Sequence, residues 1–153
     1  MNEVTIKPKK GKEITLGIRR KNIGGGGVTY STDSMPGTQI AHLIEVSPYS
    51  SVQLFKARIH VYSNKCSLFP MRVHVYRQDA KTGVPSEEII GLSEVFYVNS
   101  KGWVEINLKN NLDITENFFI AFEWLVKSDC SFESRPFISV KSVFKDSKTY
   151  YKF

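Results

Sequence analysis

Turn-forming residues recur at short, regular intervals along most of this chain. After residue 27 they cluster at 33–37, 47–51, 63–67, 79–86, 99–102, 109–113 and 128–136, and runs of strand length lie between them. Within these runs apolar and polar residues alternate, whereas no long segment has the 3.6-residue period of an amphipathic helix. The sequence therefore predicts an all-β fold, an antiparallel β-sandwich in which each strand has an inward and an outward face.

The alternation assigns faces in four segments. The expected inward rows are Phe55, Ala57, Ile59 and Val61; Met71, Val73 and Val75; Val104, Ile106 and Leu108; and Phe118, Ile120, Phe122, Trp124 and Val126. In the last segment the opposite row contains Glu123, and an unpaired carboxylate is costly in a core. We therefore expect Phe119, Ala121 and Leu125, which share that row, to face outward with Glu123.

Three connections also carry predictions. Gly83 suits a positive φ in the loop from Asp79 to Pro85. Residues 99–102 read as a four-residue hairpin connection, with Gly102 in a left-handed position. The segment from Pro85 to Leu92 is expected to form one helical turn.

Two segments of the sequence are nearly identical, RIHVY at 58–62 and RVHVY at 72–76. The alternation places the side chains of Arg58, His60, Tyr62, Arg72, His74 and Tyr76 outward, on neighbouring strands or on the two sheets. A polar outer row is what any antiparallel sandwich shows, and cross-strand contacts stabilise it without a ligand. The alternative hypothesis is that the doubled row forms one binding surface.

The positive charge is concentrated near the start of the chain. Residues 1–27 hold seven basic and two acidic side chains and end in four glycines, whereas the remaining residues are nearly neutral. We therefore predict a basic, Gly-rich linker or peripheral strands at 1–27, with short strands at 4–6 and 14–18, and a single β-sandwich domain at 28–153. Without a basic stripe or recognition helix in the domain, nucleic acid is not an expected partner. No apolar run reaches the ~20 residues of a transmembrane helix.

The residues that catalysis requires are scarce. Among the three histidines, His42, His60 and His74, the last two would hold a metal only if their outer rows were adjacent and a third ligand joined them. The sequence lacks the motifs of hydrolases, zinc proteases and phosphate-binding loops. We therefore expect no enzyme activity, no catalytic residue, no metal and no cofactor.

Cys66 and Cys130 are the only cysteines. If successive strands alternate in direction, the loops that hold them lie at the same end of the sandwich, where a disulfide is geometrically feasible. Two unrelated loop cysteines are the alternative, which a reducing compartment would favour.

The segment from Arg72 to Trp124 resembles a known family. Its elements are the strand 72–76, then Asp79 with Gly83-Val84-Pro85, Gly102-Trp103-Val104, Phe118-Phe119 and Glu123-Trp124, and the late KTYYKF is similar to a Tyr-rich final strand. These motifs resemble the jelly-roll-like β-sandwich domain that follows a carboxypeptidase-regulatory-like domain in cell-envelope proteins of Bacteroidota. The resemblance implies a jelly-roll-like sandwich, an upstream domain, and a cell-envelope or secreted location. The sequence shows no secretion signal, which leaves the cytoplasm as the alternative location.

Two functions follow as expectations. The first is a structural or protein-interaction role as a spacer or docking domain of an envelope protein. The alternative is a carbohydrate-binding module, in which sugar rings stack on exposed aromatic side chains while polar groups bond the hydroxyls. Candidate groups for binding the carbohydrate are the six residues of the doubled motif on the sheet face, or Trp103 with Asn99 at the loops.

Overall fold

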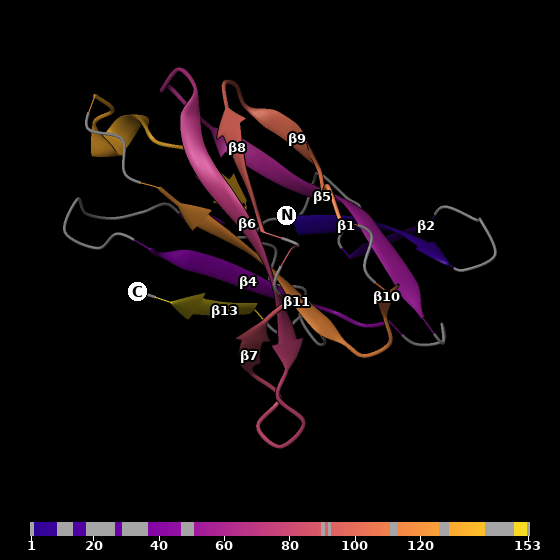
Figure 1. Ribbon diagram of the computed structural model, residues 1–153. Coiled ribbons are helices and arrows are strands. Elements are labelled where there is room, and N and C mark those ends of the chain that lie inside the picture. The colour runs from indigo at the N-terminus through magenta and orange to yellow at the C-terminus, as the bar shows by residue number, and fades with distance from the viewer. Residues whose placement is uncertain are drawn as a thin grey trace.

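A computed structural model describes residues 2–8, 14–17, 27–28, 37–46, 51–89, 91, 93–110, 113–125, 129–139 and 149–152 (Figure 1). All regular elements in these ranges are strands, apart from the short 3₁₀ helix η1 (Phe132–Ser134). The strands form two antiparallel sheets, which confirms the predicted β-sandwich.

Sheet A is built around one long strand, β5 (Val52–Ser63). On one side β5 pairs with β1 (Asn2–Pro8) and β12 (Phe137–Ser139), and these continue to β2 (Ile14–Gly17) and β3 (Gly27–Val28). Two further strands, β9 (Gly102–Asn107) and β10 (Asp113–Ile114), also pair with β5.

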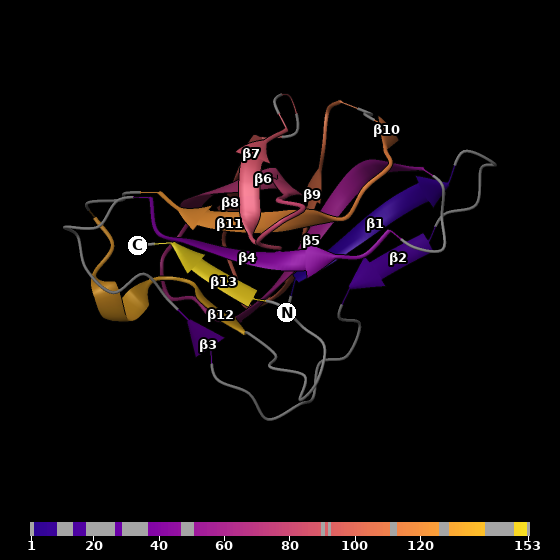
Figure 2. The ribbon, with the colours of Figure 1, turned by 90° about the horizontal axis from the view of Figure 1, so that it is seen from below.

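Sheet B has β11 (Phe118–Trp124) between β4 (Gln39–Ile44) and β6 (Phe69–Gln78). β13 (Thr149–Lys152) pairs with β4, as Figure 2 also shows, and this is the final strand predicted from KTYYKF. On the other side of β6 lie β7 (Pro85–Glu88) and β8 (Glu94–Val98). The chain crosses between the sheets several times. For example, β5 and β9 lie in sheet A, while β4, β6 and β8 lie in sheet B.

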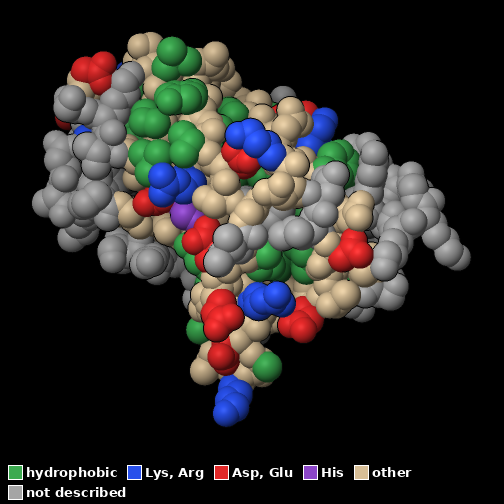
Figure 3. Space-filling view, viewed as in Figure 1, with side chains coloured by type: hydrophobic (Ala, Val, Ile, Leu, Met, Phe, Trp, Pro, Cys, Tyr) green, Lys and Arg blue, Asp and Glu red, His purple; other side chains and the backbone are tan. Residues whose placement is uncertain are grey.

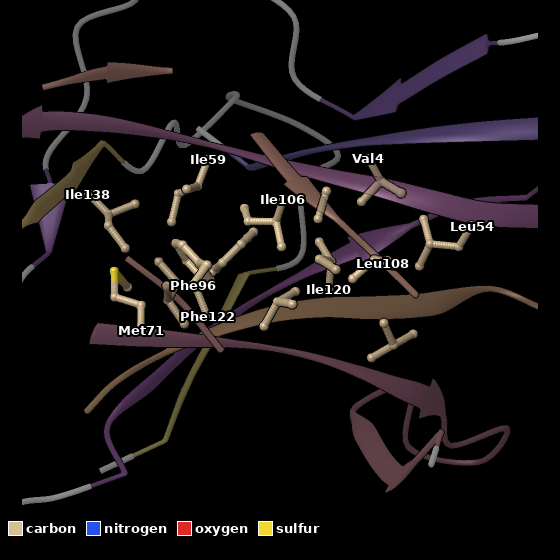
Figure 4. Packing of buried hydrophobic residues seen from close by; sticks show 14 of the residues in the cluster. Val4, Leu54, Ile59, Met71, Phe96, Ile106, Leu108, Ile120, Phe122 and Ile138 are labelled. Carbon is tan, nitrogen blue, oxygen red and sulfur yellow. The ribbon is translucent and has the colours of Figure 1, made fainter. Parts of the chain in front are cut away.

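The two sheets enclose one apolar core. Side chains from β5, β9 and β12 meet those from β6, β8 and β11, among them Ile59, Ile106, Phe96 and Phe122 (Figure 4). Phe96 packs edge-on against Phe122, with ring centroids 6.1 Å apart. The inward rows predicted for β6 and β9 are confirmed, since Met71, Val73, Val75, Ile106 and Leu108 are all buried and Val104 packs against them.

The inward row predicted for β5 is wrong at its start. Thr5 of β1 lies opposite Lys56, whereas the next residue, Ile6, lies opposite Leu54, so Phe55 is an extra residue in β5. Such a β-bulge reverses the alternation on one side of it. Leu54 is therefore fully buried, and Phe55 is not.

The faces predicted for β11 are confirmed, because the inward row packs in the core between the sheets (Phe118, Ile120, Phe122 and Trp124) while Phe119 and Ala121 lie on the opposite face; Val126 lies outside the described residues. The outer row is nevertheless not exposed. Phe119 and Ala121 are fully buried, although they share a face with Glu123. A second apolar cluster covers them, formed with Ala41 and with the partly buried Leu43 and Tyr76. β11 is central in sheet B, and in this position both of its faces are covered.

The connection from β6 to β7 follows its predicted turn chemistry. Asp79 Oδ1 accepts hydrogen bonds from the backbone N–H groups of Lys81 and Thr82, and Gly83 has a φ of 73°. The hydrogen bonds from Thr82 are the main cause that lowers the pKa of Asp79. The predicted helical turn after Pro85 is wrong, because residues 85–88 form strand β7 on the edge of β6.

The strands near the N-terminus belong to sheet A. β1 pairs with β5 from Asn2 to Pro8, and Val4 is fully buried in the core. β2 covers residues 14–17 of the short strand expected at 14–18, while residues 9–13 and 18–26 lie outside the described residues. The boundary predicted at residue 27 stays a prediction. Within the described ranges no helix has the length and apolar character needed to cross a membrane.

Candidate functional site

The RIHVY segment lies on β5 and directs its polar side chains to the outer face of sheet A. The buried Ile59 and Val61 alternate there with Arg58, His60 and Tyr62, which are partly or largely exposed. β9 brings Trp103 opposite His60, and β12 brings Phe137 opposite Ser63, next to Tyr62. We call Arg58, His60, Tyr62, Trp103 and Phe137 the aromatic face.

The side chains of the aromatic face make contacts in two groups, one around Trp103 and one between Tyr62 and Phe137. The Arg58 guanidinium lies over the Trp103 ring, with its central carbon 4.8 Å from the ring centroid. The His60 ring meets Trp103 edge-on, with centroids 5.1 Å apart. Tyr62 meets Phe137 edge-on at 6.1 Å, yet it remains 67% exposed. The face is thus a row of rings across three strands, with a cation over its largest ring.

The RVHVY segment lies on β6 and belongs to the outer face of sheet B. There the outward row holds a connected polar network rather than open side chains. His74 is only 6% exposed and stacks on Tyr76 at 5.7 Å. The Tyr76 hydroxyl donates a hydrogen bond to Gln39 Oε1 of β4 at 2.9 Å. Burial is the main cause that raises the pKa of Tyr76, so the hydroxyl keeps its proton at neutral pH.

Two carboxylates hold the ring of His74. Its Nδ1 lies 2.7 Å from Glu88 Oε1 on β7, and its Nε2 lies 2.8 Å from Glu123 Oε2 on β11. Arg72 approaches the same Glu123 oxygen at 3.5 Å. Each ring nitrogen of His74 therefore lies within hydrogen-bond distance of a carboxylate oxygen from a neighbouring strand. This network joins three strands of sheet B and stabilises them.

The doubled motif does not form a single surface. Because β5 and β6 lie in different sheets, His60 and His74 belong to opposite outer faces of the sandwich. These two histidines are therefore not placed to bind one metal ion together. The described residues contain no group of three or more metal-binding side chains placed to share an ion.

The loop with Asn99 connects the two sheets instead of forming a hairpin. β8 pairs with β6 in sheet B and β9 pairs with β5 in sheet A, so the predicted hairpin is wrong. Gly102 has a φ of 111°, which confirms its left-handed position. Asn99 is exposed and its side chain accepts a hydrogen bond from the hydroxyl of Ser100 in the same loop.

Cys66 and Cys130 are joined in a disulfide, with Cα atoms 5.8 Å apart. The bond links the β5–β6 loop to the segment that follows β11. The backbone N–H groups of Lys65 and Cys66 also donate to the carbonyl oxygen of Ser134 in that segment. Both cysteines are buried, so the disulfide is part of the packing at this end of the sandwich.

Several residues of the two outer faces were missed in the sequence. Gln39, Glu88 and Phe137 join their partners only through the folded arrangement, and nothing in their local sequence indicates it. Val95 and Tyr97, which are 45% and 60% exposed, flank the buried Phe96 in EVFYV. Because side chains alternate along a strand, a buried Phe96 in EVFYV predicts that Val95 and Tyr97 lie on the exposed face.

His42 lies in β4 on the row that faces the core, between Ile40 and Ile44. Burial lowers its pKa to about 4, so the ring is neutral at pH 7. In the unfolded chain His42 binds a proton below about pH 6.5, whereas in the folded chain it does so only near pH 4. The free energy of unfolding therefore falls as the pH drops from 6.5 to 4.

We expect the free energy of unfolding to fall by about 3 kcal/mol between pH 7 and pH 4 through His42 alone. Urea unfolding of the wild type and of His42→Gln at several pH values measures this effect, because groups common to both chains cancel in the difference. A difference that does not change with pH would contradict the prediction.

Comparisons with known proteins do not add a family to this description: no family model matches the chain, and no curated protein or solved structure does.

Proposed function

We propose that this domain is a non-catalytic, protein-binding module of an exported or cell-envelope protein, and that it binds its partner through the aromatic face of sheet A. The observation that supports the proposal is the group of aromatic rings on one outer face, with Arg58 over Trp103 and with Tyr62 largely exposed beside Phe137. Trp, Tyr and Arg side chains dominate the binding energy of protein interfaces, since they offer large contact area together with a polar group.

The geometry favours a polypeptide over a sugar as the ligand. A sugar ring binds by stacking flat on an aromatic ring, and Trp103 is the largest ring of the face. The guanidinium of Arg58 and the edge of His60 already contact that ring. A sugar on the guanidinium side would have to displace Arg58, whereas a protein partner can pack around the pair. Carbohydrate binding stays the second candidate because the exposed Tyr62 ring offers a stacking surface.

The disulfide supports the proposed location. Disulfides form and persist in oxidising compartments such as the periplasm and the cell exterior. The resemblance to envelope domains points to the same location. We accordingly propose that the chain is a relative of the jelly-roll-like domains that follow a carboxypeptidase-regulatory-like domain.

The test compares two ligand libraries on the same protein. We expect selection from a displayed peptide library to yield peptides that bind the domain in monovalent titrations, and Tyr62→Ser/Arg58→Gln to weaken this binding by about tenfold or more. Tyr97→Ser, which removes a similarly exposed tyrosine from sheet B, is the matched control and leaves binding unchanged.

A glycan array is screened with the same three proteins. Glycan binding that depends on Tyr62, without peptide binding, would replace the protein partner by a carbohydrate. Peptide binding that is insensitive to the double substitution, or no binding in either screen, would contradict the role of the aromatic face.

A further inference from the structure

An exposed apolar strip crosses the outer face of sheet B, where β6 and β8 meet. Figure 3 shows hydrophobic side chains gathered over this part of the molecule. The register pairs Val95 with Arg72 and Tyr97 with Pro70, and paired residues share a face of the sheet. Leu68, just before β6, is 58% exposed. Leu68, Val95 and Tyr97 are all among the large hydrophobic residues that are exposed in the described part of the chain.

Strand β8 lies at an edge of sheet B among the described strands. Within the described ranges, β8 pairs with β6 and with no other strand. An edge strand with exposed apolar side chains is a template for pairing with another chain, and proteins normally block it with charge, proline or a covering segment. In EVFYV the only charged residue is Glu94 at the start, where Lys109 pairs with it at 3.1 Å.

The hydrogen bonds of β6 show which backbone groups of β8 face that edge. The Ile89 N–H donates to the carbonyl of Val75 toward β7, whereas the Leu125 N–H donates to the carbonyl of Pro70 toward β11. Odd-numbered residues of β6 therefore direct their backbone groups to β7 and β8. Their partners in β8 are Glu94, Phe96 and Val98. It follows that the N–H and C=O groups of Val95 and Tyr97 point to that edge.

We propose that β8 pairs with β8 of a second copy of this chain, antiparallel, about a twofold axis at Phe96. In that register Val95 lies opposite the second copy's Tyr97, and each pair exchanges both of its backbone hydrogen bonds. The exposed side chains of Val95 and Tyr97 then form cross-strand pairs on the outer face. Phe96, at 9% the most exposed of the buried apolar residues, meets its own copy on the core side.

The charges at the two ends of β8 agree with this arrangement. Glu94 begins the strand, and the exposed Lys101 lies in the loop that follows it. In an antiparallel pair the first residue of one β8 strand, Glu94, lies beside the last residues of the other β8 strand. Lys101 follows those last residues, so it comes near the Glu94 of the other copy. Glu94 lies opposite the second copy's Val98, so the pair brings no like charges face to face. The proposal uses sheet B and is independent of the aromatic face.

The test is the oligomeric state of the whole chain, measured by sedimentation equilibrium over a concentration series. We expect a monomer–dimer equilibrium, and expect Val95→Lys/Tyr97→Lys to raise its dissociation constant by about tenfold or more. Val84→Lys is the matched control, since Val84 is an exposed hydrophobic residue of the β6–β7 loop. This control should dimerise like the wild type. A monomer at every concentration, or a dimer that the double substitution leaves intact, would overturn the proposal.

Amide hydrogen exchange of the wild-type chain tests the register without any substitution. The amides of Val95 and Tyr97 should exchange more slowly as concentration rises, because only the dimer bonds them. The Phe96 amide, already bonded to β6, serves as the internal reference. Exchange at Val95 and Tyr97 that does not depend on concentration would show that β8 is not the interface, even if the lysine variant fails to fold.

Discussion

Replacing Phe122 by alanine is expected to lower the free energy of unfolding by about 3 to 5 kcal/mol. Phe122 is fully buried at the centre of β11 and its ring packs against Phe96 of β8. Alanine would leave a cavity between the two sheets that the surrounding strands fill only in part. Chemical denaturation of the wild type and Phe122→Ala, each with the disulfide intact, measures the difference.

Two further variants make the Phe122 result specific. Phe119→Ala should destabilise the chain by about as much, since Phe119 is also fully buried, although on the other face of β11. Val84→Ala, at an exposed position in the β6–β7 loop, should change stability by no more than about 0.5 kcal/mol. A loss near that small value for Phe122→Ala would mean that Phe122 does not lie in the core.

Loss of the disulfide is expected to lower stability by about 4 kcal/mol, because the cysteines are 64 positions apart and the bond restricts a long loop in the unfolded chain. The bond also holds the β5–β6 loop against the segment after β11, where both cysteines are buried. Cys66→Ser/Cys130→Ser, compared with the oxidised wild type by urea unfolding, measures the effect.

Reduced wild-type protein is the control for the disulfide, because it has lost the bond but keeps the cysteine side chains. It should unfold at a similarly low urea concentration. Two free thiols in protein folded under oxidising conditions, found by mass analysis, would contradict the pairing itself. Equal stability of the oxidised and reduced chains would instead show that the bond contributes nothing to the fold.

In the candidate site, the alternation along one strand predicts which side chains face outward, but it does not predict which residues of other strands they contact. Arg58, His60 and Tyr62 were placed correctly on an outer face, because the alternation along β5 is unbroken there. Their contacts with Trp103 and Phe137 depend on which strands lie beside β5. Glu123 was correctly judged too costly to bury unpaired. It lies on a largely covered face because His74 and Arg72 accompany it, which no spacing in the sequence indicates.

The sequence by itself determined the all-β class, the inward rows of β6 and β9, the positive φ of Gly83 and Gly102, and the polar character of the two repeated segments. These properties depend on residues within one strand or one turn, where side-chain period and backbone sterics act locally. Only the tertiary structure decided that RIHVY and RVHVY lie on opposite sheets, that Phe55 forms a bulge, and that Phe119 is buried. These depend on which strand pairs with which, and pairing is set by packing between residues far apart in the chain.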